Sequence, residues 1–191
     1  MKYYNNTNNI NFKWEQVSKA IFLRYPNPWS KHVYSEDTIS RTVEGPILKT
    51  VRLLTKNTAV KAPQFMGRFV PTGPVCIVEE SHIDAMKKTI ITYTRNTAFN
   101  HIANVVERCE FSLSKDNKNK TLVKREAWVI SNVYGLSKAI EMFFFDRYKS
   151  QVKKSLKGLE YILNKMYVPE KILSMDLSHS LSRTVPLAHR I

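Results

Sequence analysis

Apolar positions recur along this chain with two different spacings, which divide it into helical and extended segments. Over residues 14–24 apolar side chains such as Trp14 and Val17 return every three or four positions, which predicts an amphipathic helix. A longer pattern of the same kind, from residue 136 to about 166, predicts a second helix. Apolar or alternating runs bounded by turn residues predict strands at 33–43, 48–56, 75–83, 89–96, 102–113 and 121–133.

The order of these elements indicates a single α+β domain, as the length of 191 residues also suggests. We expect a curved antiparallel sheet of about six to seven strands wrapped on the long C-terminal helix, because both must bury an apolar face. Such an arrangement can leave an internal cavity. The domain is expected to span residues 1–166. The periodicity stops after Tyr167, so residues 167–191 are expected to form a mobile tail.

One apolar stripe follows the long helix when its residues are placed at 100° intervals. Arg147 and Lys154 are seven positions apart and lie on one border of the stripe, about 10 Å apart along the axis. From a border, a cation can bury its stem and extend its charged head to an anion, whereas Lys153 points away. Ordinary flanking charges would produce the same pattern. The stripe contains Leu136, Ile140, Phe144, Tyr148, Val152, Leu159, Ile162 and Met166.

A second group of cations lies on the strand at 48–56. Side chains alternate along a strand, so Arg52, Leu54 and Lys56 share one face. If that face is inward, the buried cations need a partner of opposite charge, which a phosphate ligand would supply. If it is outward, the charges are simply solvated.

A third group lies at a stiff corner, where the Pro-Asn-Pro sequence ends the first helix. Arg24 precedes these prolines, and Lys31 and His32 follow them. The three could face one anion, but a simple helix-to-strand turn with solvated charges explains the same residues.

The charge balance favours an anionic partner. Thirty Lys and Arg against 16 Asp and Glu give a net charge of +14, and 43% of the residues are hydrophobic, enough for a core. The partner could be a lipid headgroup, a membrane surface or a nucleic acid. We expect no transmembrane helix, secretory signal or cleaved presequence. Cys76 and Cys109 are isolated in sequence and are expected to be buried reduced thiols.

Two other classes of function are weighed against lipid binding. The chain has no Gly-x-Ser-x-Gly elbow, no His-Glu-x-x-His motif and no phosphate-binding glycine loop. We therefore expect no catalytic residues, no cofactor and no metal site. A basic nucleic-acid-binding module is the alternative, because nine Tyr and nine Phe could stack on bases. The aromatic residues lie mostly on apolar stripes, however, so nucleic acid is not the expected partner.

Four ordered motifs resemble one known family. They are RYPNPWSKHV at 24–33, SEDTISR at 35–41, RLLTK at 52–56 and REAWV at 125–129. Over about residues 1–166 the chain resembles the PRELI family of lipid-transfer proteins, whose shape is similar to that of phosphatidylinositol-transfer proteins. The Lys-His-Val form is most similar to the PRELI branch, associated with phosphatidic acid, rather than the slowmo branch, associated with phosphatidylserine.

The resemblance implies where the cargo binds. The segment 61–72 is similar to the family's lid, so Phe65, Met66 and Phe69 would contact a bilayer or bound acyl chains. Phe65 stands where relatives often have tryptophan. The residues alone also allow a small surface helix packed on the domain. The basic positions that match the family's headgroup pocket are Arg24, His32, Arg52, Lys56, Arg147 and Lys154.

The implied function is transport of phosphatidic acid between the outer and inner mitochondrial membranes, with no covalent step. Exposing about 30 lipid methylenes to water costs more than about 20 kcal/mol, so a carrier must enclose them. Phosphatidylserine or another anionic phospholipid is the alternative cargo. The resemblance also implies reversible contact with a membrane surface, a role in cardiolipin metabolism and a location in the mitochondrial intermembrane space. A small twin-cysteine helical-hairpin protein there is the implied partner.

Overall fold

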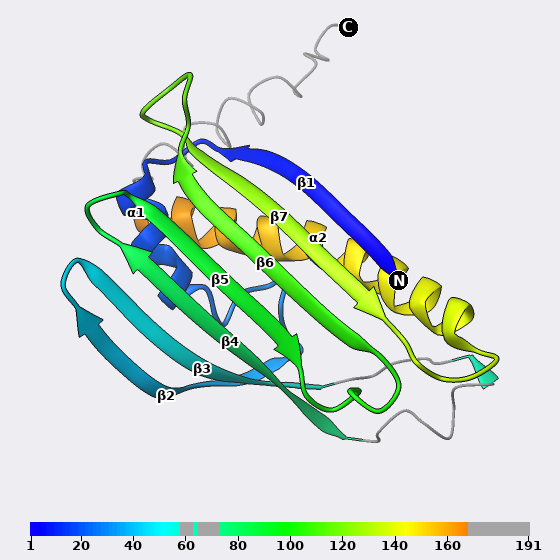
Figure 1. The fold of residues 1–191 in the computed structure, drawn as a ribbon. Coiled ribbons are helices and arrows are strands. Elements are labelled where there is room, and N and C mark those ends of the chain that lie inside the picture. The colour runs from blue at the N-terminus through cyan, green and yellow to red at the C-terminus, as the bar shows by residue number, and fades with distance from the viewer. Residues whose placement is uncertain (58–62, 65–72, 168–191) are drawn as a thin grey trace, which may run out of the picture.

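The structure, a computed structural model, describes residues 1–57, 63–64 and 73–167. Within these residues seven antiparallel strands form one sheet in the order β1-β7-β6-β5-β4-β3-β2 (Figure 1). The helical elements are α1 (Trp14–Ala20), the 3-10 turn η1 (Ile21–Leu23) and α2 (Ser137–Tyr167). The strands are β1 (Lys2–Ile10), β2 (Val33–Glu44), β3 (Ile47–Asn57), β4 (Pro74–Asp84), β5 (Thr89–Asn96), β6 (Asn104–Leu113) and β7 (Thr121–Ile130).

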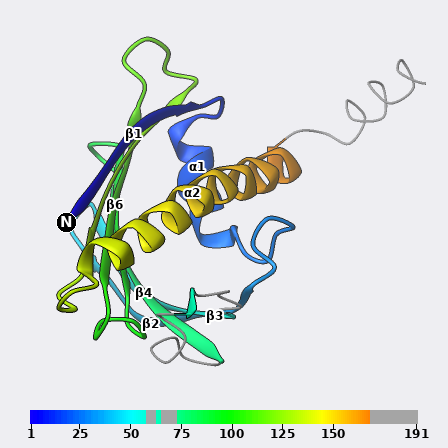
Figure 2. The ribbon, with the colours of Figure 1, turned by 90° about the vertical axis from the view of Figure 1, so that its right-hand side faces the viewer.

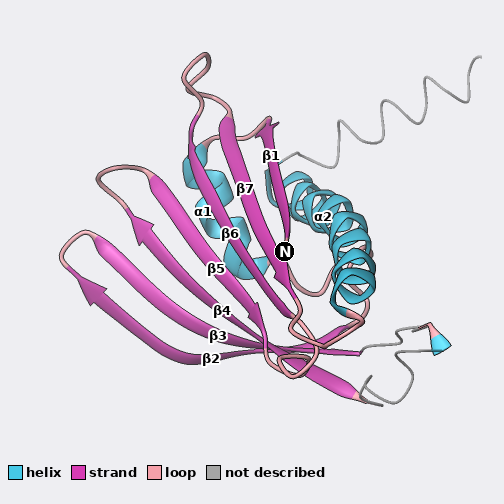
Figure 3. Cartoon of the chain, turned by 45° about the vertical axis from the view of Figure 1, so that its right-hand side comes forward, coloured by secondary structure: helices cyan, strands magenta, loops and turns pink. Residues whose placement is uncertain are grey.

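The sheet is curved, and both helices lie on the same side of it (Figures 2 and 3). The hydrophobic core under α2 is divided into two clusters. Ile140 and Phe144 near the start of α2 belong to one cluster. Leu159 and Leu163 near its end belong to the other, which also includes α1. The middle of α2 lies between the two clusters, and polar residues there face the sheet.

The fold class predicted from the sequence is confirmed. The predicted elements match α1, β2 to β7 and α2, with differences of one to three residues at most ends. The helix expected over 14–24 ends as an α-helix at Ala20 and continues as a 3-10 turn to Leu23. The strands expected at 102–113 and 121–133 are shorter and comprise Asn104–Leu113 and Thr121–Ile130.

The first strand was not predicted. β1 pairs with β7 from Lys2 opposite Val129 to Ile10 opposite Thr121. Its residues alternate between half-buried and exposed, as on a sheet with one covered face. Asparagines fill much of this segment, and asparagine is depleted in strands, so composition concealed the alternation.

The apolar stripe of α2 differs from the prediction at its C-terminal end. Met166 was expected to face the core but is 37% exposed, while Leu163 is completely buried. The reason is that α1 packs beside the last turns of α2, so the covered face there includes both Ile162 and Leu163.

Two expectations concern residues that are not described. The lid residues Phe65, Met66 and Phe69 lie outside the described part of the chain, and so do residues 168–191 of the expected tail. In the described part, no helix is both long enough and apolar enough to cross a bilayer.

Candidate functional site

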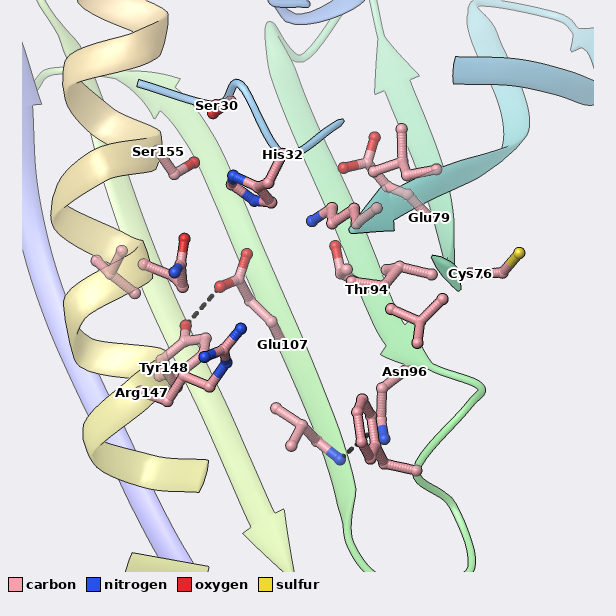
Figure 4. A pocket seen from close by; sticks show the side chains of 18 of the residues that line it. Ser30, His32, Cys76, Glu79, Thr94, Asn96, Glu107, Arg147, Tyr148 and Ser155 are labelled. Atoms are coloured by element: carbon pink, nitrogen blue, oxygen red, sulfur yellow. Dashed lines mark hydrogen bonds between the residues drawn. The ribbon is translucent and has the colours of Figure 1, made fainter. Parts of the chain in front are cut away.

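A cavity of about 230 Å³ lies between α2 and the concave face of the sheet (Figure 4). Its walls combine apolar and charged side chains, as a site for an amphiphile requires. The apolar part of the lining includes Leu54, Val75, Ile77, Phe99, Val105 and Phe144. The charged and titratable groups are Arg24, Tyr25, His32, Lys56, Cys76, Glu79, Glu107, Arg125, Arg147 and Tyr148.

One buried carboxylate, that of Glu79, pairs with two arginines. Arg52 lies opposite Glu79 in the β3–β4 register, and the two form an ion pair. Arg24, which follows η1, pairs with the other oxygen of Glu79, and Arg52 also pairs with Glu36. Burial by itself raises the pKa of Glu79, but Arg24 and Arg52 outweigh it and lower the pKa to about 2. All three groups are therefore charged and internally compensated.

This arrangement decides the question that strand alternation left open. Arg52 and Leu54 are each 1% exposed, so the face they share with Lys56 is inward. From the sequence, a phosphate ligand was the expected partner of a cation buried on this face. For Arg52 the protein itself supplies that partner, through Glu36 and Glu79. Lys56 lines the cavity instead.

A second buried network joins α2 to the sheet. The Tyr148 hydroxyl donates to Glu107 Oε2 at 2.5 Å, and Arg125 Nη1 lies 3.3 Å from the same oxygen. Burial, followed by the charge of Glu107, raises the pKa of Tyr148, which keeps its proton as a donor. Burial also raises the pKa of the nearby Cys109 thiol to about 12. Figure 4 shows the Tyr148–Glu107 bond spanning from helix to sheet.

The remaining cations converge on His32. Burial lowers the pKa of His32, and the positive charges of Lys56, Lys154 and Arg147 lower it further. Among the described residues no ion pair involves Lys56, Arg147 or Lys154. Burial alone lowers the pKa of Arg147, which lines the cavity. Like charges gathered without counter-ions form an anion-binding site.

The corner after η1 holds its cavity residues rigidly. The buried Asn27 side chain donates to the Arg24 carbonyl at 2.6 Å and accepts from the Trp29 N–H at 2.9 Å. The bond between Tyr25 and Pro26 is cis. Arg24 and His32 line the cavity as expected, but Lys31 is exposed and does not. Of the two interpretations of this corner, a solvated charge applies to Lys31, whereas Arg24 and His32 face the cavity.

The predicted headgroup residues divide into three groups by position. Arg24, His32, Lys56 and Arg147 line the cavity. Arg52 lies in the ion-pair network behind the cavity. Lys154 is exposed at the border of the cavity, close enough to lower the pKa of His32. Sequence analysis missed the roles of Glu79, Glu107 and Arg125, although each falls at a position where its strand faces inward. A charged residue at an inward-facing strand position was the feature of the sequence that could have identified them.

Comparison with known proteins agrees with this fold. The model of the PRELI-like family matches residues 15–169. The chain belongs to the PRELI-like family. The match to the family model covers α1 from Glu15 onward, β2 to β7 and α2. It includes all six basic residues singled out from the sequence.

Among its relatives in this family, PRELI domain-containing protein 1, mitochondrial, from Gallus gallus is 42% identical over 166 residues, 84% of this chain and 76% of the relative. The protein of the same name from Homo sapiens is 38% identical over 179 residues, 91% and 81% of the two chains. Protein UPS1, mitochondrial, from Saccharomyces cerevisiae is 33% identical over 153 residues, 78% and 86%. The names of these relatives are consistent with placing the chain in the PRELI branch of the family.

Solved structures of distant sequence share the architecture of this PRELI-like chain. The Zhui aromatase/cyclase from Streptomyces sp. R1128 superposes with a TM-score of 0.60 at 9% identity, covering 87% of this chain and 96% of the other. A protein from Thermus thermophilus gives a TM-score of 0.58 at 13% identity, covering 87% and 99%. At such identities the likeness shows the fold alone.

Proposed function

We propose that this chain carries anionic phospholipids between membranes and that phosphatidic acid is its preferred cargo. The observation that supports this proposal most directly is the group of cations around His32, which has no carboxylate partner among the described residues. These cations border a cavity that also has apolar walls. A water-soluble anion would bind to the cations alone. An amphiphile such as a phospholipid binds to both the cations and the apolar walls.

The charge of the site favours a phosphomonoester. A phosphomonoester carries about −1.5 to −2 charges near neutral pH, whereas a phosphodiester carries one. Lys56, Arg147 and Lys154 together supply three positive charges. Arg147 adds a planar fork that can bind two phosphate oxygens at once. Phosphatidylserine, with a diester and a carboxylate, is the alternative cargo.

The buried network of Arg24, Arg52 and Glu79 has a different role in this proposal. Arg24 and Arg52 are compensated by Glu36 and Glu79, so they contribute shape rather than a free charge. The described cavity, at about 230 Å³, accommodates a headgroup and the first part of the acyl chains. A whole diacyl lipid needs more room, so loading must widen the site. Phe65, Met66 and Phe69 are proposed to cover the chains or contact the bilayer.

The proposed setting follows from the relatives. Several are named as mitochondrial, which supports a mitochondrial location for this chain. We place it in the intermembrane space, where it would extract phosphatidic acid from one membrane and deliver it to the other without covalent chemistry. A small twin-cysteine helical-hairpin protein is the proposed partner. The net charge of +14 favours reversible contact with an anionic leaflet, at about 1 kcal/mol per cation.

A lipid-transfer assay tests the cargo and the site together. Donor liposomes containing fluorescent phosphatidic acid are mixed with acceptor liposomes and the purified protein, with and without its partner. Lys56→Ala and Arg147→Ala should each reduce the transfer rate at least tenfold, because each removes an uncompensated cation. Lys153→Ala is the matched control, since Lys153 is exposed on the same helix and does not line the cavity.

Arg24 is less suitable for this test. Its loss would leave the buried Glu79 carboxylate with only one of its two arginine partners and would endanger folding. Transfer rates that are unchanged in both folded variants, Lys56→Ala and Arg147→Ala, would refute the proposed headgroup site. Mass spectrometry of the lipid retained after purification identifies the cargo independently.

A further inference from the structure

Glu107 places a negative charge in a cavity whose free charges are otherwise positive. Its Oε2 oxygen accepts from Tyr148 and faces Arg125. No hydrogen bond or ion pair among the described residues involves its other oxygen, Oε1. The Glu107 side chain keeps 18% of its surface accessible, and Figure 4 shows its carboxylate directed into the cavity below His32.

The orientation of this carboxylate is held from two sides. Tyr148 on α2 and Arg125 on β7 both approach Oε2, so Oε1 is left facing the cavity. A carboxylate oxygen accepts hydrogen bonds and cannot donate them. An anionic ligand group beside Oε1 must therefore carry a proton to donate, or it is repelled.

This requirement distinguishes phosphomonoesters from phosphodiesters. A phosphomonoester that carries one negative charge retains a proton on one of its oxygens, whereas an ionised diester has none. We infer that Glu107 determines specificity by accepting a hydrogen bond at Oε1 from the protonated oxygen of a phosphomonoester headgroup. The remaining phosphate oxygens then face Lys56 and Arg147. This inference rests on the proposed function, because it concerns the same cavity and the same cargo.

Several charged and titratable groups surround Glu107, and each could affect how lipid binding depends on pH. Arg125 comes from β7, Tyr148 and Arg147 from α2, and Cys109 from β6 itself. The others are Arg24 after η1, Glu79 on β4, His32 before β2 and Lys56 on β3. Of these, His32 has a pKa that burial, then Lys56, Lys154 and Arg147, lower from the ordinary value of 6.5, towards the range where a phosphomonoester loses its second proton, at about pH 6. The test must therefore separate His32 from the headgroup.

A competition between two lipids of equal charge provides that separation. Phosphatidylcholine vesicles are prepared with equal amounts of phosphatidic acid and phosphatidylmethanol, which have the same acyl chains. Near pH 5 both lipids carry about one negative charge, and only phosphatidic acid has a phosphate proton to donate. The ratio of the two lipids retained by the protein is measured by mass spectrometry, so it does not depend on how much protein is folded.

The wild type should retain more phosphatidic acid than phosphatidylmethanol near pH 5, and Glu107→Gln should reduce that preference by a factor on the order of ten, the value of a charged hydrogen bond. Near pH 8 the sign should reverse. The phosphate is then dianionic and is repelled by Glu107, so Glu107→Gln should increase the relative retention of phosphatidic acid.

Three control variants separate this role from a structural one. Glu110→Gln makes the same change on the outward face of β6, where Glu110 pairs with Arg108, and should leave the ratio unchanged. Tyr148→Phe removes one of the two contacts that orient Glu107 but keeps the carboxylate, so it should reduce the preference by less than Glu107→Gln does. His32→Gln in the wild-type and Glu107→Gln backgrounds removes the other group that titrates, and the reversal should persist.

Each outcome tests one of the two proposals. If the wild type retains neither anionic lipid, the proposed function fails. If it retains both but Glu107→Gln has the wild-type ratio at both pH values, the function survives and the role of Glu107 is overturned. An equal change at both pH values would also overturn it, because that is the result expected for loss of a structural contact.

Discussion

The side-chain amide of Asn27 packs directly against Gly158 of α2. A Cβ atom at position 158 would lie 2.8 Å from Asn27 Oδ1, closer than such contacts allow. The amide cannot easily move away, because it is buried and bonded to the Arg24 carbonyl and the Trp29 N–H. The absence of a side chain at 158 therefore sets the distance between the Pro-Asn-Pro corner and α2. That distance in turn positions Arg24 and His32.

Gly158→Ala is expected to destabilise the protein despite its better helix propensity. Alanine is favoured over glycine inside a helix by about 1 kcal/mol. Overpacking a buried contact costs about 1–3 kcal/mol, so we expect a net loss of about 1 kcal/mol in the free energy of unfolding. Urea unfolding measures this loss. Slower lipid transfer should accompany it, since the corner carries cavity residues.

A double-mutant cycle with Asn27→Ala tests the cause. Asn27→Ala alone removes two hydrogen bonds and should be destabilising. In that background the added methyl group at position 158 has room, so Gly158→Ala should cost nothing or be stabilising. Strictly additive losses would show that the two residues do not act on each other.

Glu79→Gln should destabilise the fold strongly at neutral pH. The substitution removes the buried carboxylate that compensates Arg24 and Arg52, and breaking a buried ion pair costs about 3–5 kcal/mol. Glu44→Gln is the control, because Glu44 pairs with Lys49 at the exposed hairpin and should change stability by less than about 0.5 kcal/mol. Comparable losses in the two variants would contradict this ranking.

The same carboxylate should contribute to acid unfolding. The pKa of Glu79 is about 2 in the folded protein, below its ordinary value of 4.5. Its contribution to stability is therefore present above about pH 4.5 and is lost as the pH falls towards 2. Over this interval the wild type should lose more stability than Glu79→Gln. Unfolding curves recorded at several acidic pH values measure the difference.

The pKa of His32 should change when an anion binds in the cavity. Burial, then Lys56, Lys154 and Arg147, lower its pKa in the empty protein. A bound phosphate offsets those charges and should raise the pKa of His32. The protein then takes up a proton on binding, so affinity should increase as the pH falls through the interval between the two pKa values.

NMR titration of the histidine ring measures the change in His32, with His32→Gln used to assign its signal. His82, whose ring pairs with Glu80 at 2.9 Å outside the cavity, is the reference, and lipid should leave its NMR signals in place. A His32 curve that does not move with lipid would place the anion elsewhere.

The two cysteines should differ in reactivity towards maleimide. The thiolate is the reactive form, and burial raises the pKa of Cys109 to about 12. Cys76 is half-buried and lines the cavity. We expect Cys76 to be labelled first, because it is the more exposed of the two thiols. Mass spectrometry of the labelled protein checks this, and Cys76→Ser should remove the fast phase.

The positions of most elements were predictable because they depend on local patterns. Helical and strand periodicities placed α1, β2 to β7 and α2, and the Pro-Asn-Pro sequence placed the rigid corner. The strand β1 was not predictable in this way, since pairing with β7 compensates for its asparagines. Among the cavity residues, Arg24, His32, Lys56 and Arg147 were recognisable from the sequence, but Arg125 and the two carboxylates Glu79 and Glu107 were not.

The sequence by itself determined that Arg52 and Lys56 share a face, that Arg147 borders an apolar stripe, and that the chain is strongly basic. Only the tertiary structure decided which of these cations are free. Glu79 lies 27 residues from Arg52 and 55 from Arg24, and Glu107 lies 41 from Tyr148. Alternation along a strand tells which side chains point the same way, but whether a buried charge has a partner depends on residues that folding brings together from distant parts of the chain.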